Sequence, residues 1–167
     1  MSLRFISYGK KLDNLKITVD HRLIGSEFAT FKEKVKKNDT LILVADSKVW
    51  GTAVVCSEVE VDHSVRIWAD KPYPYRAKIS NVFLFKNPFH FEKYQLNDDF
   101  RELYGKGWAF KFLFTPGDIP KSIEKKLEEI LGDQVCIPEN EQSSYLEKLS
   151  NESKKARRLK LGLTSVE

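Results

Sequence analysis

Trp68 and Tyr73 are the two residues whose types and spacing best suit a binding chemistry. Flat aromatic rings can stack on a nucleobase, which contributes roughly 1–3 kcal/mol per base. The same stretch carries side chains that can hold phosphate groups, namely Arg66, Lys71, Arg76 and Lys78. Aromatic rings interleaved with positive charge are typical of nucleic-acid sites. The alternative is that both rings are buried in the core, as most large aromatic residues are.

The loop that carries the two rings is predicted to be stiff. Pro72 and Pro74 fix φ, remove amide donors and favour extended conformations in the residues before them. Apolar residues then alternate from position 75 onward, which predicts a strand that runs to about Phe85 and ends at Pro88. We therefore expect the rings to stand apart at the entrance to a sheet, facing an open slot wide enough for one nucleobase.

Signatures of catalysis are weak in this sequence. It has no G-x-x-x-x-G-K-[ST] phosphate loop, no G-x-S-x-G turn and no H-E-x-x-H zinc motif. His21 beside Asp20, and His63 beside Asp62, could each pair a base with an orienting carboxylate, but such neighbours are more often polar surface. The pattern assembles no metal site and requires no cofactor. We therefore expect a binding module and not an enzyme.

Composition predicts one domain with a small appendage. The chain has 167 residues, 41% hydrophobic and 31% charged, with a net charge of +4 that permits an anionic partner. Cys56 and Cys136 lack zinc-type spacing and are predicted to be small buried residues. There is no signal peptide and no apolar run that could span a bilayer, so we expect a cytoplasmic protein.

The elements that must position the loop can be read from periodicity. Residues 12–25 fit a helix slightly better than a strand, and residues 41–45 form an apolar strand expected at the centre of the sheet. Gly51 interrupts the next strand, which indicates a bulge or a close backbone approach. A further strand is expected over 108–114, and helices over 118–132 and 139–160. Trp50 and Trp108 lie within strands and are predicted to be core residues.

These elements predict an α+β fold with a curled mixed β-sheet, or a small barrel, flanked by helices. A base-recognition domain is expected over residues 1–137. Residues 138–167 are expected to form a C-terminal basic helix or linker.

Several segments together resemble the EVE domains and, more distantly, the YTH domains of the PUA-like superfamily. They are Asn38-Asp39 before the strand 41–45, Trp50-Gly51-Thr52 with the strand after it, Ile67-Trp68, and the run 72–79. The similarity extends from about Leu3 to Leu131 and rests on order and spacing. It implies the PUA-like, EVE/YTH-type form of the fold described above.

The resemblance also implies a set of site residues. In YTH domains two cage aromatics come from the loop before a sheet strand, and Trp68 and Tyr73 match their spacing. A polar residue near the start of the first helix reads the base edge, and Asn14 matches it. The remaining cage wall is aromatic in those domains, whereas here the matching residue is Ile24, followed by Gly25 and Ser26. Phosphate contacts are expected from Lys71, Arg76 and Lys78.

The function implied is recognition of a modified base that is flipped out of its strand into the aromatic pocket. N6-methyladenine in double-stranded DNA is the leading candidate. Such domains occur at the N-terminus of McrB-like subunits of modification-dependent restriction systems. A fused GTPase motor and a nuclease subunit are therefore the implied partners, with no membrane. The alternative is an RNA-binding PUA-like module without modification specificity.

Overall fold

A mixed six-stranded sheet organises the chain, whose computed structural model describes residues 2–108 and 119–160. The sheet order is β1-β3-β4-β6-β2, and β5 pairs with β6 outside this path. The strands are β1 (Leu3–Ser7), β2 (Leu23–Ser26), β3 (Thr40–Ala45), β4 (Lys48–Val55), β5 (Glu60–Val61) and β6 (Tyr75–His90). The helices are α1 (Leu12–His21), α2 (Thr30–Lys34), η1 (Lys93–Gln95), α3 (Leu96–Tyr104), α5 (Lys121–Gly132), η2 (Glu139–Glu141) and α6 (Gln142–Lys160).

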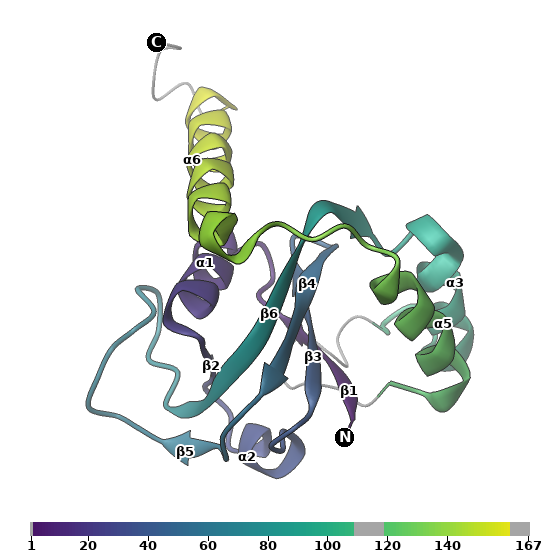
Figure 1. Cartoon of the computed structure of the whole chain (residues 1–167), viewed down its shortest axis with the longest axis horizontal. Helices are drawn as coiled ribbons and strands as arrows, with labels where there is room; N and C mark the ends of the chain where they lie inside the picture. The colour runs from purple at the N-terminus through teal and green to yellow at the C-terminus, as the bar shows by residue number, and fades with distance from the viewer. Residues whose placement is uncertain (1, 109–118, 161–167) are drawn as a thin grey trace.

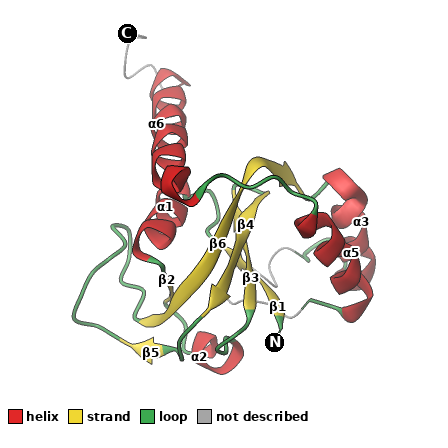
Figure 2. Cartoon of the chain, viewed as in Figure 1, coloured by secondary structure: helices red, strands yellow, loops and turns green. Residues whose placement is uncertain are grey.

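The expected α+β class is confirmed. The sheet curls into a half-barrel, with α1 and α6 on one side of it and α3 and α5 on the other (Figure 1 and Figure 2). β1 runs parallel to β3, whereas β4, β6 and β2 are joined by antiparallel pairings. β3 lies between β1 and β4, so the prediction that residues 41–45 form a central strand is correct.

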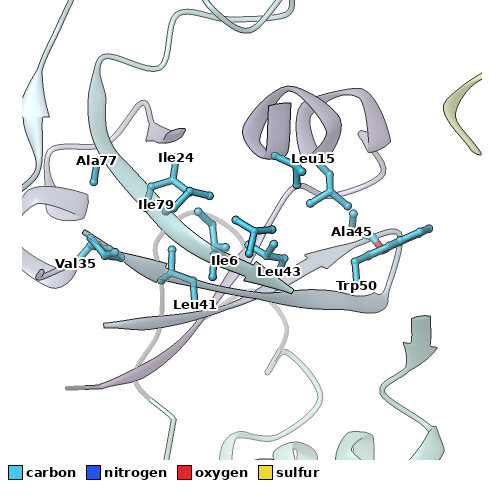
Figure 3. Close-up of a cluster of buried hydrophobic side chains, with 14 of the residues drawn as sticks. Ile6, Leu15, Ile24, Val35, Leu41, Leu43, Ala45, Trp50, Ala77 and Ile79 are labelled. Carbon is cyan, nitrogen blue, oxygen red and sulfur yellow. The ribbon is translucent and has the colours of Figure 1, made fainter. Parts of the chain in front are cut away.

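Two hydrophobic clusters fill the two faces of the sheet, because alternate residues of each strand point to opposite sides. Leu41 and Leu43 of β3 belong to the cluster beneath α1, together with Ile24 and Ile79 (Figure 3). Ile42 of β3 belongs to the other cluster, which includes residues of α3 and α5. The expected core positions of Trp50 and Trp108 are confirmed, since both are buried.

Gly51 is needed for the close approach of two strands. A Cβ atom at this position would lie 2.0 Å from the backbone oxygen of Phe83 on β6. The register between β4 and β6 also shifts between Val49 and Gly51. Both features agree with the bulge or close approach that the sequence indicated.

Three predictions about local structure were wrong. The favoured helix over 12–25 stops at Arg22, which has a left-handed φ of 51°, and β2 follows because residues 23–26 pair with β6. β6 does not end at Pro88 but runs to His90, and Pro88 falls in a register shift where the ladder with β4 is interrupted. Cys56 and Cys136 are exposed.

The C-terminal third of the chain agrees with the predicted elements in outline. α5 and α6 occur where helices were expected, whereas positions 109–114 of the expected aromatic strand and the helix start at Asp118 lie outside the described residues. Trp108 stacks on Phe100, with ring centroids 5.0 Å apart and an interplanar angle of 17°.

The first half of α6 packs on α1, and the second half projects away from the sheet (Figure 1). Leu146 is 2% exposed and belongs to the cluster beneath α1. The Gln142 side-chain amide donates to the Val82 carbonyl at 2.8 Å, and Lys154 lies 3.2 Å from the Asp13 carboxylate. A domain boundary at residue 137 stays a prediction, with these contacts crossing it.

Candidate functional site

Arg76 fixes the loop that connects β5 to β6. Its Nε donates to the Tyr73 carbonyl at 2.8 Å, one terminal nitrogen donates to the Val65 carbonyl, and the other lies 3.6 Å from the Asp62 carboxylate. Its guanidinium also lies over the Trp68 ring, 5.6 Å from the centroid. The side chain is 7% exposed, so it joins both ends of the loop from within.

This placement corrects the expectation that Arg76 contacts phosphate. A buried guanidinium that already donates to two backbone carbonyls is not placed to contact a strand on the surface. The other two predicted phosphate contacts differ from it. Lys78 is exposed, and Lys71 is exposed with its ammonium 3.4 Å from the Glu27 carboxylate.

Trp68 packs into the protein below the loop. Its indole nitrogen donates to the Thr18 hydroxyl of α1 at 3.4 Å, and Thr18 is fully buried. The indole also lies directly against Gly25 of β2, where an added Cβ would be 2.6 Å from the Trp68 Cη2 atom and 2.9 Å from the Tyr73 Cβ atom. Only glycine fits this contact without a shift of the rings.

Tyr73 covers the indole of Trp68. The ring centroids are 5.4 Å apart and the planes meet at 82°, an edge-to-face contact. Stacking a base between two rings needs those rings to be nearly parallel and about 7 Å apart, because each stacked contact takes about 3.5 Å. The expected open slot is therefore not present between these rings. Trp68 is 2% exposed, so its face is closed to solvent.

Asp70 links the aromatic pair to the start of α1. The Tyr73 hydroxyl donates to one carboxylate oxygen of Asp70 at 2.7 Å, and the Lys11 ammonium lies 2.7 Å from the same oxygen. The Asn14 side-chain amide donates to the other Asp70 oxygen at 3.3 Å and to the Tyr73 hydroxyl at 3.4 Å. These four residues form one hydrogen-bonded cluster, which we call the Asp70 cluster.

The electrostatics of the Asp70 cluster follow from its contacts. Burial alone would raise the pKa of Asp70, but hydrogen bonds from Lys11, Tyr73 and Asn14 outweigh it and lower the pKa to about 2. Burial, together with the neighbouring Asp70 carboxylate, raises the pKa of the Tyr73 hydroxyl. At neutral pH the cluster therefore holds an ionised acceptor, Asp70, beside a protonated donor, Tyr73.

The structure brings together four of the six predicted pocket residues: Trp68, Tyr73, Asn14 and Gly25. Ile24 and Gly25 point to opposite faces of β2, and Ile24 is fully buried in the cluster beneath α1 (Figure 3). The Ser26 hydroxyl accepts a hydrogen bond from the Phe28 amide at 3.1 Å, which closes a local turn. Neither residue forms a wall beside the aromatic pair, which corrects that expectation.

Sequence reasoning missed Asp70, Lys11 and Thr18. Asp70 lies between Trp68 and Tyr73 in the sequence and could for that reason have been considered as a site residue. Lys11 and Thr18 gave no signal, because their roles depend on how α1 lies against a loop some fifty residues later.

Metal-binding clusters and membrane-spanning helices are both missing from the described residues. Residues 2–108 and 119–160 contain no group of three His, Cys, Asp or Glu side chains arranged to hold a metal ion. None of the helices in the described ranges is both long enough and apolar enough to cross a bilayer.

Comparison with known proteins identifies the fold. No protein-family model matches the sequence, and no curated protein matches it either. Solved structures do match, and they place the chain in the YTH/PUA-like fold class.

One matching structure is the Pho92 YTH domain in complex with m6A, with a TM-score of 0.56. It is 15% identical, and the match covers 81% of this chain and 89% of that one. The YTH domain of Zygosaccharomyces rouxii MRB1, solved with N6-methyladenosine RNA, is 16% identical over 77% and 86% of the chains, with a TM-score of 0.49. At these identities the likeness concerns the fold.

Proposed function

We propose that this chain is a nucleic-acid-binding module that recognises a modified base flipped into a pocket formed by Trp68 and Tyr73. The observation that carries the proposal is the Asp70 cluster, which sets hydrogen-bonding groups beside an indole ring. The fold supports it, because the similarly folded Pho92 YTH domain was solved with m6A. N6-methyladenine in DNA is the preferred ligand.

The contacts suggest how such a base would enter. Tyr73 must leave the Trp68 face, which breaks its hydrogen bond to Asp70 at a cost of about 1.5–3 kcal/mol. Stacking of a base on the indole returns roughly 1–3 kcal/mol, and flipping the base costs a few kcal/mol more. Phosphate contacts must supply the remaining free energy. Lys71 and Lys78 are exposed and are the residues proposed to make those contacts.

The Asp70 cluster would select the base by its edge. An ionised carboxylate only accepts hydrogen bonds, so Asp70 favours a base with an exocyclic amine. N6-methyladenine keeps one N–H on that nitrogen. Asn14 could donate to the adjacent ring nitrogen, and the methyl group would then lie against the indole. A base with a carbonyl at that position would meet Asp70 oxygen to oxygen.

We further propose that the module is the targeting domain of a modification-dependent restriction system. A GTPase motor and a nuclease, in other domains or subunits, would then carry out translocation and cleavage. This part rests on the resemblance of the sequence to the N-terminal domains of McrB-like subunits. The module itself is proposed to be non-catalytic and cytoplasmic.

The proposal is tested with matched DNA and RNA oligonucleotides, each with and without N6-methyladenine, at one salt concentration. Binding is followed by fluorescence anisotropy of labelled oligonucleotides. We expect the methylated DNA to bind at least tenfold more tightly than the unmethylated DNA. Equal affinities for methylated and unmethylated strands would overturn recognition of this modification.

An RNA-binding module without modification specificity is the second candidate. The closed contact between Trp68 and Tyr73 favours it, because binding on the surface needs no opening of these rings. It predicts equal affinity for methylated and unmethylated RNA, with RNA preferred over DNA. The same set of oligonucleotides therefore separates the two candidates.

A further inference from the structure

A cavity lies beside the end of β6 that is farther along the chain from the Asp70 cluster. It has a volume of about 860 Å³ and is formed where β1 ends, where the chain turns between β3 and β4, and where β6 passes into the segment before α3. The cavity shares no lining residue with the Asp70 cluster, although Lys10 on its rim directly precedes Lys11 of that cluster. Its volume is within the range of small-molecule sites, about 300–1,000 Å³.

The inner wall of the cavity is aromatic. Phe91 is partly exposed and meets Trp108 edge to face, with centroids 5.3 Å apart. It meets Phe5 in the same way at 5.6 Å. Both of these neighbours are buried, so they hold the Phe91 ring in place as a fixed stacking surface.

The rim of the cavity carries unpaired positive charge. Lys10, Arg101 and Lys106 line it and are exposed, and none of them forms an ion pair with a carboxylate in the described part of the chain. Two lysines elsewhere differ in this respect, because Lys11 is paired with Asp70 and Lys126 with Asp99. Arg101 offers a planar fork of donors that matches phosphate geometry.

Other polar groups of the lining modulate this charge. His90, Ser47 and Asn97 can donate hydrogen bonds, and Asp46 and Glu92 are carboxylates on the same rim. Three cations against two carboxylates leave a net positive site. The carboxylates also provide acceptors for the amine or hydroxyl groups of a bound molecule.

We propose that this cavity binds a nucleotide unit, with its base against Phe91 and its phosphate among Lys10, Arg101 and Lys106. A simple inorganic anion would leave the aromatic wall unused. An uncharged aromatic compound would leave the three cations unused. A base joined to a phosphate uses both, and it can be a free nucleotide or one residue of a strand.

The proposal is tested by NMR on the ¹⁵N-labelled full chain. AMP, adenosine and inorganic phosphate are titrated separately, and the amide signals of His90, Asn97 and Arg101 are followed. A phosphorylated four-nucleotide DNA strand is added in a fourth titration to distinguish a free nucleotide from a residue within a strand. We expect AMP or the strand to shift these signals with an affinity at least tenfold above that of adenosine or phosphate.

Substitutions at exposed residues should keep the fold intact, so they can locate the site. Arg101→Ala combined with Lys106→Ala is expected to weaken the nucleotide affinity at least tenfold. Lys125→Ala, at an exposed position of α5, is the matched control and should leave the affinity unchanged. The signals followed here belong to residues of the cavity and not to the Asp70 cluster, so failure of this proposal is distinguishable from failure of the proposed function.

Two results would overturn the proposal. One is the absence of shifts at His90, Asn97 and Arg101 at millimolar AMP and with the strand. The other is equal affinity for phosphate alone, which would identify an anion site without base recognition.

Discussion

The Cη2 atom of Trp68 lies 2.6 Å from the point where a Cβ atom on Gly25 would stand. This contact couples a buried indole to the backbone of β2 and sets the depth at which the ring lies. A methyl group at position 25 must displace the indole and also Tyr73, whose Cβ atom would be 2.9 Å away.

The first prediction is that Gly25→Ala destabilises the protein by about 1–3 kcal/mol, as overpacking does. Thermal denaturation measures the effect. Gly132→Ala, in α5, is the control, because a Cβ there meets nothing within 4 Å and should be neutral or stabilising by up to about 1 kcal/mol. If both variants melt at the same temperature, Trp68 does not rest on Gly25 as described.

The second prediction concerns Tyr73. Tyr73→Phe removes the hydroxyl that donates to Asp70 but keeps the ring. Movement of the ring away from Trp68 therefore becomes easier. We expect a stability loss of about 1.5–3 kcal/mol with affinity for methylated DNA kept or increased. Tyr73→Ala removes the ring and should lower the affinity at least tenfold. Calorimetry and anisotropy on both variants check this, and equal affinities for the two variants would remove Tyr73 from the binding site.

The third prediction is a pH dependence from Asp70. Its pKa is about 2 in the folded protein, below the ordinary value of 3.8, so its contribution to stability is present above pH 4 and is lost as the pH falls toward 2. The difference in melting temperature between the native protein and Asp70→Asn should therefore shrink between pH 5 and pH 2. Asp98→Asn, at an exposed position of α3, serves as the control. A difference that stays constant over this range contradicts the described cluster.

The fourth prediction separates two cations of β6. Arg76→Lys keeps the charge but loses the fork that holds the Tyr73 and Val65 carbonyls, so stability should fall by about 1–3 kcal/mol and the loop should become sensitive to proteases. Lys78→Ala should leave the melting temperature unchanged. The same substitution should lower the affinity for all strands alike. It should also make the slope of log affinity against log salt concentration shallower by about 0.9. An Arg76→Lys variant with native stability and weaker binding would restore Arg76 as a phosphate contact.

The fifth prediction tests the boundary at residue 137. A chain that ends there loses Leu146 from the core and the Gln142 bond to Val82, so we expect a stability loss of about 3 kcal/mol or more. A chain that ends at Lys155 keeps these contacts and should melt like the full protein. Equal melting of the shorter chain would show that the domain is complete at residue 137.

The sequence alone determined the elements whose signals are local. The run of apolar residues at 41–45 predicted a central strand, and Gly51 predicted a bulge or a close backbone approach, because both depend on the chemistry of a few neighbouring residues. The prolines and aromatic residues of the loop likewise marked Trp68 and Tyr73, and the order of segments indicated the PUA-like fold.

The tertiary structure decided what each side chain of the loop contacts. The way α1 and β2 lie against a loop far along the chain decides two features of the site. One is whether Arg76 faces solvent or lies over Trp68. The other is whether Trp68 is open or covered by Tyr73. Two of the three hydrogen bonds that depress the pKa of Asp70 come from Lys11 and Asn14, which are more than fifty residues away in sequence. Periodicity carries no information about such pairings, because it records the environment along one element and not the distance between two of them.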